Sequence, residues 1–168
     1  MRIVKRSVFA LALLLTGCGW HLRQPAQLPA AMQRTYINDA TGDTELVRQL
    51  RRSLITPTSN VIDDATTATA TLNILNARQF QRVLSVSNTG QPLEYQVAYQ
   101  VQFSLTDAKG KALIEAQTLT LTRNYAYDVA NALGDVEQAN VLYKAMQDNM
   151  AQLILFRLQA LGRGTGKP

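Results

Sequence analysis

A strict alternation of apolar and polar side chains over residues 95–106 constrains the fold of this chain more than any other feature. Successive strand residues point to opposite faces of a sheet, so a period of two over twelve residues predicts one long strand with a buried face and a polar face. The apolar set is Tyr95, Val97, Tyr99, Val101, Phe103 and Leu105, and the intervening set is Gln96, Ala98, Gln100, Gln102, Ser104 and Thr106.

Three further strands are predicted around this one. Residues 68–86 and 112–125 flank it, and the short turn sequences Asn88-Thr89-Gly90 and Asp107-Ala108-Lys109-Gly110 join the three segments. Turns of this kind connect antiparallel neighbours. The last of the three further strands is shorter and is predicted over residues 34–38.

Two helices are expected in addition. The first opens near Thr41-Gly42-Asp43-Thr44 and ends before Pro57, and the second runs from Asp135 to about Leu161. Helical spacing of three and four predicts a buried stripe on each. The first stripe is Leu46, Val47, Leu50 and Leu54, and the second is Ala139, Leu142, Met146, Met150, Leu153, Phe156 and Ala160. The predicted fold class is therefore α+β, with two helices packed on one face of a four-stranded, largely antiparallel sheet.

The other face of that sheet is expected to be polar but uncharged. Charged residues are only 17% of the chain, against about 25% in an average soluble domain. Two interpretations remain open: threonine is a good strand former on a wet face, or the face is a hydrogen-bonding interface with a polar partner. The residues expected to form it are Gln96, Gln100, Gln102, Thr118, Thr120 and Thr122.

The N-terminus has the features of a secretory signal. Arg2, Lys5 and Arg6 precede an apolar run over residues 8–15, which is too short for a membrane-spanning helix of about 20 residues. The following Leu15-Thr16-Gly17-Cys18 resembles the bacterial lipobox. This resemblance implies that residues 1–17 are removed and that Cys18 is acylated. Gly19, in place of an acidic residue, then implies the outer membrane.

The remaining chain divides into three expected parts. Residues 18–32 are predicted to be a lipid-anchored tether, 33–162 a single domain, and 163–168 a disordered tail. Loss of Arg2, Lys5 and Arg6 would lower the formal charge from +5 to about +2, so nucleic acid is not expected as a partner.

No catalytic or metal site is expected. His21 is the single histidine and Cys18 the single cysteine, so a structural metal site lacks ligands. No nucleophile–base pair is recognisable, and Asp63-Asp64 reads as part of a solvated loop. We therefore expect a protein that is not an enzyme and carries no cofactor besides the covalent lipid on Cys18.

Several segments resemble the LptE family of lipopolysaccharide-assembly lipoproteins from Gram-negative outer membranes. They are Cys18-Gly19-Trp20-His21-Leu22-Arg23 with Leu28-Pro29, Gly90-Gln91-Pro92-Leu93-Glu94-Tyr95-Gln96, Arg123 and Glu137-Gln138. The resemblance implies a non-enzymatic plug inside the lumen of an LptD-like β-barrel. It also implies support of barrel assembly and a part in inserting lipopolysaccharide into the outer leaflet. The implied location is the outer membrane, lipid-anchored, on the periplasmic side and within the lumen.

The family's basic residues for lipopolysaccharide near the hairpin turn and before the last helix are missing at residues 87–90 and 130–134. Strand pairing is instead expected to bring Arg82, Glu94 and Arg123 to one end of the sheet, with Arg78 further along. Arg78, Arg82 and Arg123 are therefore candidate lipopolysaccharide contacts, because arginine forks suit phosphates. The alternative for these residues is a surface pair with Glu94.

Two other functions stay open from the residues alone. One is a periplasmic lipoprotein that binds a small apolar ligand between helices and sheet, which predicts an apolar cavity there. The other is a lipid-anchored hydrolase, which the absence of a nucleophile–base pair disfavours.

Overall fold

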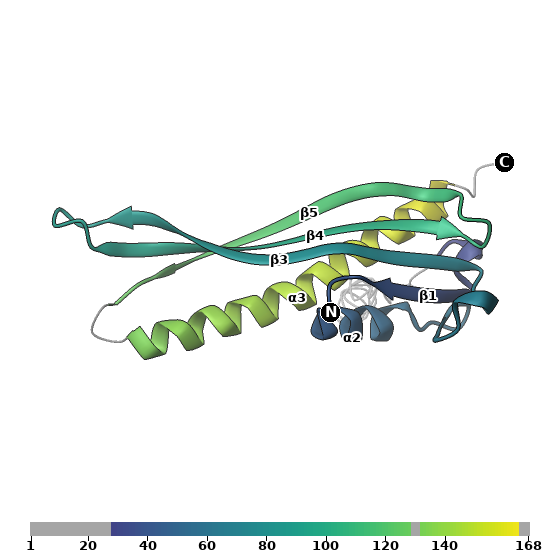
Figure 1. Cartoon of the computed structure of the whole chain (residues 1–168), viewed down its shortest axis with the longest axis horizontal. Coiled ribbons are helices and arrows are strands. Elements are labelled where there is room, and N and C mark those ends of the chain that lie inside the picture. Colours follow the sequence, from purple (N-terminus) through teal and green to yellow (C-terminus); the bar gives the residue numbers. More distant parts are fainter. Residues whose placement is uncertain (1–27, 129–131, 165–168) are drawn as a thin grey trace, which may run out of the picture.

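The computed structural model describes residues 28–128 and 132–164 (Figure 1). The predictions for the signal peptide 1–17, for acylated Cys18, for tether residues 18–27 and for tail residues 165–168 lie outside these ranges. The elements in chain order are η1 (Ala30–Met32), β1 (Arg34–Asp39), α2 (Thr44–Leu54), β2 (Asn60–Ile62), η2 (Ala65–Thr67), β3 (Ala70–Val86), β4 (Pro92–Asp107), β5 (Ala112–Ala126) and α3 (Ala132–Gly164).

The sheet has five strands in the order β2-β1-β3-β4-β5 (Figure 1). β3, β4 and β5 are antiparallel neighbours, as predicted, but β1 is parallel to both β2 and β3. The prediction of four largely antiparallel strands was wrong in these two respects. β2 has three residues, which is too few for a period-two pattern, and the α2 crossover after β1 brings the chain back in parallel.

Both helices cover one face of the sheet. The Asp43 carboxylate accepts a hydrogen bond from the Leu46 backbone N–H at 3.1 Å and so caps the start of α2. Leu46, Leu50 and Leu54 of α2 are fully buried, as their spacing predicted. They share one core with α3 and with the inward residues of the strands, among them Leu72, Val101 and Phe103.

The stripe predicted for α3 was correct in its first half and wrong in its second. Met146 and Met150 are fully buried, but the buried row continues through Ile154 and Leu158, while Leu153 and Phe156 are 36% and 46% exposed. A spacing of four keeps the row facing the sheet, whereas the predicted steps of three turn away from it. Ala160 of the predicted stripe is exposed as well.

The ends of the folded region also differ from the prediction. Met32 is fully buried and its carbonyl accepts bonds from Thr35 Oγ1 and Ser59 Oγ at 3.1 and 2.6 Å. Leu28 packs against the core. The fold therefore begins inside the segment expected as a tether, and α3 begins before Asp135 and continues into the expected tail, to Gly164.

Candidate interaction surface on the outer face of the sheet

The side of the sheet away from the helices, here called the outer face, carries the predicted polar set. Residues opposite one another in an antiparallel pair lie on the same face, and Gln100 pairs with Thr120 while Gln102 pairs with Thr118. Between residues 96 and 124 of β4 and β5, the outward side chains of the in-register region carry no charge. They are Gln96, Ala98, Gln100, Gln102, Thr118, Thr120, Thr122 and Asn124.

Two hydrogen-bonded rows of side chains, here called the Arg–Gln rows, cross the outer face from β3 to β5. In the first, Arg78 Nε donates to Gln100 Oε1 at 2.8 Å and Gln100 Nε2 donates to Thr120 Oγ1 at 3.1 Å. In the second, Arg82 Nε donates to Gln96 Oε1 at 2.9 Å and Gln96 Nε2 donates to Asn124 Oδ1 at 3.1 Å. Each glutamine is thus oriented by β5 to accept from the arginine.

A third polar row crosses the other end of the same face. Asn38 Nδ2 on β1 donates to Asn73 Oδ1 on β3 at 3.0 Å, and Asn73 Nδ2 lies 3.5 Å from Ser104 Oγ on β4. The sequence did not single out Asn38, Asn73 or Asn124, since lone asparagines carry no period-two signal. The rows make the outer face an array of oriented hydrogen-bonding groups.

The three candidate arginines are not brought together. Arg78 and Arg82 lie on the outer face opposite Gln100 and Gln96, but Arg123 pairs with Val97 and therefore lies on the helix-covered face. One step along a strand reverses the direction of the side chain, which separates Arg123 from Gln96 and its row. The Arg123 guanidinium instead donates to its neighbouring Thr122 carbonyl at 3.0 Å.

The expected arginine pair with Glu94 is not formed. Within residues 28–128 and 132–164, the ion pairs are Arg48–Glu45 and Arg51–Asp63. Glu94 instead accepts a hydrogen bond from Ser85 Oγ at 2.9 Å. The Arg78 guanidinium carbon lies 5.9 Å from the centre of the Phe80 ring, which is itself exposed. Both outer-face arginines therefore keep terminal nitrogens that no carboxylate of the described residues pairs with.

A buried polar cluster behind the sheet holds the helices under the outer face. The Tyr99 hydroxyl donates to Asp43 Oδ2 at 2.7 Å, and Gln147 Nε2 of α3 donates to Asp43 Oδ1 at 2.9 Å. Burial raises the pKa of Tyr99, and the Asp43 carboxylate raises that pKa further. The cluster links β4, α2 and α3, so it fixes the helix layer against the strands that carry the Arg–Gln rows.

The β3–β4 hairpin projects beyond the N-terminal end of α3 (Figure 1). Its outer part carries exposed apolar side chains, since Val83, Leu84, Val86 and Leu93 are 42–56% exposed. Next to them, the Tyr95 ring stacks on Tyr125 with 5.8 Å between centroids and meets Tyr127 edge-on at 5.1 Å. This apolar projection was not predicted, because the apolar side chains of each strand were expected to lie in the core.

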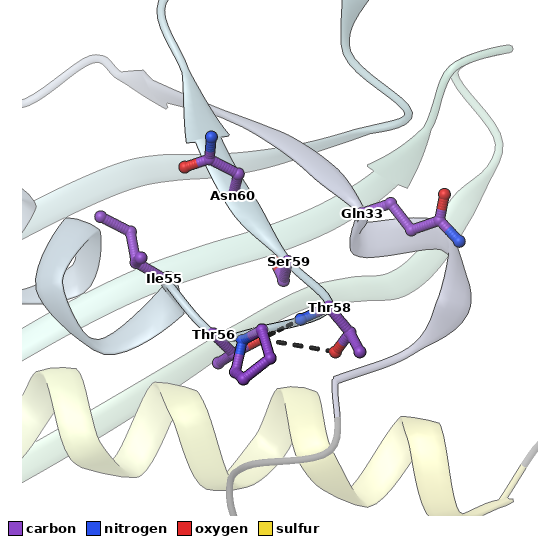
Figure 2. Close-up of a pocket in the computed structure, with 7 residues that line it drawn as sticks. Gln33, Ile55, Thr56, Thr58, Ser59 and Asn60 are labelled. Carbon is purple, nitrogen blue, oxygen red and sulfur yellow. Dashed lines mark hydrogen bonds between the residues drawn. The ribbon is translucent and has the colours of Figure 1, made fainter.

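The small-ligand alternative finds no support in the described structure. A surface depression of about 520 Å³ lies beside the loop between α2 and β2 (Figure 2) and is lined by Gln33, Ile55, Thr56, Pro57, Thr58, Ser59 and Asn60. Its lining is half polar and half apolar, and Figure 2 shows the Thr56 and Thr58 side chains hydrogen-bonded to each other within it. It does not lie between the helices and the sheet, where an apolar cavity was expected.

Two other features are absent from residues 28–128 and 132–164. No three His, Cys, Asp or Glu side chains gather there in a way that could hold a metal ion. Among the helices of the same ranges, none combines the length and apolar character needed to cross a membrane.

Comparisons with known proteins give matches over most of the chain. The family model of LptE, described as lipopolysaccharide-assembly, matches residues 32–158. The LPS-assembly lipoprotein LptE of Pectobacterium atrosepticum is 26% identical over 153 residues, which cover 90% of this chain and 82% of the relative. The LPS-assembly lipoprotein LptE of Yersinia pestis is 27% identical over 90% of this chain and 73% of its own length.

A solved structure shows the same arrangement of elements. The solution structure of lipoprotein B from Nitrosomonas europaea has a TM-score of 0.71 and 29% identity, and the match covers 88% of this chain and 97% of that one. The family match extends over most of the described fold, including the strands that form the outer face. The chain belongs to the LptE family of non-enzymatic lipopolysaccharide-assembly lipoproteins.

Proposed function

We propose that this chain is an outer-membrane lipoprotein that plugs the lumen of an LptD-like β-barrel. In this role it supports barrel assembly and takes part in inserting lipopolysaccharide into the outer leaflet. Acylated Cys18 provides the anchor, and the β4–β5 part of the outer face is the surface that meets the barrel wall.

The uncharged polar character of the β4–β5 part of the outer face carries this proposal. A solvated sheet face usually includes Lys and Glu, whereas the in-register part of β4 and β5 presents Gln, Thr and Asn around Ala98. The lumen of an outer-membrane barrel is polar. Neutral hydrogen-bonding groups can meet such a wall without leaving a buried, unpaired charge, which is expensive in an interface.

The Arg–Gln rows support the same interpretation through their geometry. Each row fixes the amide of Gln96 or Gln100 between a donor and an acceptor. Fixed side chains lose less rotamer entropy on docking than free ones, since an immobilised flexible side chain costs about 0.5–1.5 kcal/mol. The outer face is thus pre-organised for a partner that also presents oriented polar groups.

Lipopolysaccharide is proposed to contact Arg78 and Arg82. Their Nε atoms are bound to the glutamines, while their terminal nitrogens form no ion pair with any carboxylate of the described residues. Such forks suit phosphate groups. Arg123 lies on the opposite face and would require a separate contact.

The segment between Cys18 and Leu28 limits how far the folded domain can lie from the membrane. Cys18 precedes Leu28, which packs on the core, by ten residues. A fully extended chain of that length spans at most about 35 Å. The folded domain therefore lies within about that distance of the membrane surface that holds the lipid.

Site-specific photo-crosslinking in cells tests the proposal. A photoreactive residue at Gln100 or at Thr120 is expected to trap a large outer-membrane barrel protein. Asn149, an exposed and neutral position on α3, is the matched control. Barrel adducts at Asn149 alone would keep the plug but move its contact to the helix layer. No barrel adduct at any of the three positions would refute the plug.

A further inference from the structure

We propose that the free chain forms a two-fold symmetric dimer by pairing the open edges of two β5 strands, centred on Thr120. This inference goes beyond the proposed function, and it requires no barrel. Its basis is the edge of the sheet rather than the outer face. The occupant of the edge is a second copy of this chain.

The β5 edge lacks the usual protection against strand pairing. β5 is the last strand of the sheet and is 15 residues long, with no proline and no lysine in it. Its two register irregularities lie between the partners of Phe103 and Leu105 and between those of Leu105 and Thr106, so Gln117 to Arg123 run straight alongside β4. Natural proteins blunt such edges with lysine, proline, bulges or short strands. A long edge without lysine or proline, straight over these residues, is therefore expected to be covered by another strand.

The register identifies which backbone groups of β5 point outward. Tyr127 N donates to Leu93 O at 2.8 Å, so the pair Leu93 and Tyr127 is a hydrogen-bonded pair of the β4–β5 ladder. Hydrogen-bonded and non-hydrogen-bonded pairs alternate along an antiparallel ladder. Continued along the register to the middle of β5, this alternation makes Thr118, Thr120 and Thr122 members of non-hydrogen-bonded pairs. Their N–H and C=O groups therefore point away from β4.

One of these outward backbone groups already accepts a hydrogen bond from a side chain. The Thr122 carbonyl accepts a hydrogen bond from the guanidinium of Arg123 at 3.0 Å. An exposed side chain on the same strand thus supplies a donor that a neighbouring strand would otherwise supply. Thr118, Thr120 and Thr122 themselves are exposed.

The sequence of this edge is self-complementary. Thr118-Leu119-Thr120-Leu121-Thr122 reads the same in both directions. Antiparallel pairing about a two-fold axis at Thr120 places Thr120 opposite its own copy and Thr118 opposite Thr122. Each outward backbone group then meets another outward group, so the ladder closes without a change of register.

The side chains agree with this register on both faces. Threonine meets threonine on the outer face, and Leu119 meets Leu121 on the helix-covered face, and cross-strand pairs of these kinds stabilise a sheet. Arg123 falls opposite Gln117 of the second copy, so no like charges are opposed. A slip by one residue would set leucine against threonine and turn every side chain to the wrong face. These features favour a second copy, because the contact is isologous.

Charge exchange at the two-fold axis tests the dimer. The mature lipoprotein is purified in detergent, and its mass is followed over a concentration series by light scattering. Thr120→Lys and Thr120→Glu each place two like charges face to face, which is expected to weaken the dimer roughly fivefold. An equimolar mixture of the two variants pairs opposite charges, and it is expected to recover the dimer.

Two comparisons keep the result interpretable. Thr89→Lys adds the same charge at the exposed β3–β4 turn and is expected to dimerise like the parent. A variant that merely misfolds would not be rescued by mixing, so recovery in the mixture reports the edge contact itself. A parent that stays monomeric at all concentrations, or a Thr120→Lys dimer as tight as the parent, would overturn the proposal. Failure of the barrel contact would leave the dimer intact, so the two ideas are tested separately.

Discussion

Removal of the Tyr99 hydroxyl tests whether the buried polar cluster holds the helix layer under the sheet. Tyr99 is fully buried, and its hydroxyl donates to Asp43 Oδ2 at 2.7 Å. The change Tyr99→Phe keeps the ring and deletes one bond to a carboxylate. The Asp43 carboxylate retains its hydrogen bonds from Leu46 N and Gln147 Nε2, so two donors still stabilise its charge.

The expected loss follows from that geometry. A hydrogen bond to a charged group contributes about 1.5–3 kcal/mol. The remaining bonds of Asp43 favour the middle of this range, so the free energy of unfolding should fall by about 2 kcal/mol. For a domain of this size, 1 kcal/mol shifts Tm by about 2–4 °C, so a decrease of about 4–8 °C is expected.

Urea denaturation followed by circular dichroism measures the change. Tyr143→Phe is the matched control, because it deletes a hydroxyl that donates to the Phe80 carbonyl, an uncharged acceptor, at 3.1 Å in a half-buried position. That variant should lose only about 0.5–1 kcal/mol. Equal losses in the two variants, or no loss in Tyr99→Phe, would refute the role assigned to the cluster.

The same tyrosine predicts a loss of stability at alkaline pH. Its pKa is raised in the folded protein above the ordinary tyrosine value of about 10. Above that pH the unfolded chain releases the proton while the folded chain keeps it, so stability present below pH 10 falls as pH rises. Tyr99→Phe should flatten this slope by at most about 1.4 kcal/mol per pH unit.

Three further outcomes are expected. Met150→Ala empties a fully buried site on α3 and should lower the free energy of unfolding by about 2–5 kcal/mol, measured in urea. Arg78→Gln or Arg82→Gln should weaken binding of purified lipopolysaccharide about tenfold in titration calorimetry, while Arg123→Gln, on the other face, should leave it unchanged. Gly90→Ala should destabilise by about 1 kcal/mol, because φ there is +78° although no atom lies within 4 Å of the added Cβ; a much larger loss would indicate a contact instead of a backbone effect.

Local patterns predicted the elements that are long and regular. The alternation over residues 95–106 located β4, and the leucine spacing located α2. The polar set on β4 and β5 was also placed on one face correctly, because both strands stay in register from Phe103 to Glu94. β2 was missed, because three residues carry no period.

The prediction of buried residues failed where contact with another element decides which side chains are buried. Two apolar rows of α3 have helical spacing. The predicted row runs through Leu153 and Phe156, and the observed buried row runs through Ile154 and Leu158. The sequence cannot distinguish them, since either row is apolar. Contact with the sheet selects the row, and the other remains exposed.

The sequence by itself determined that this chain builds a long antiparallel sheet with one apolar face and one face on which β4 and β5 present uncharged polar side chains, since side-chain alternation is a property of the backbone. Only the tertiary structure decided where the arginines lie. Leu72 and Ile74 face the core, and uninterrupted alternation would direct Arg78 and Arg82 to the same side. A bulge between Ile74 and Asn76 inserts one residue, reverses the alternation, and places both arginines on the outer face beside Gln100 and Gln96. A bulge depends on pairing with the neighbouring strand, so no local pattern in the sequence announces it.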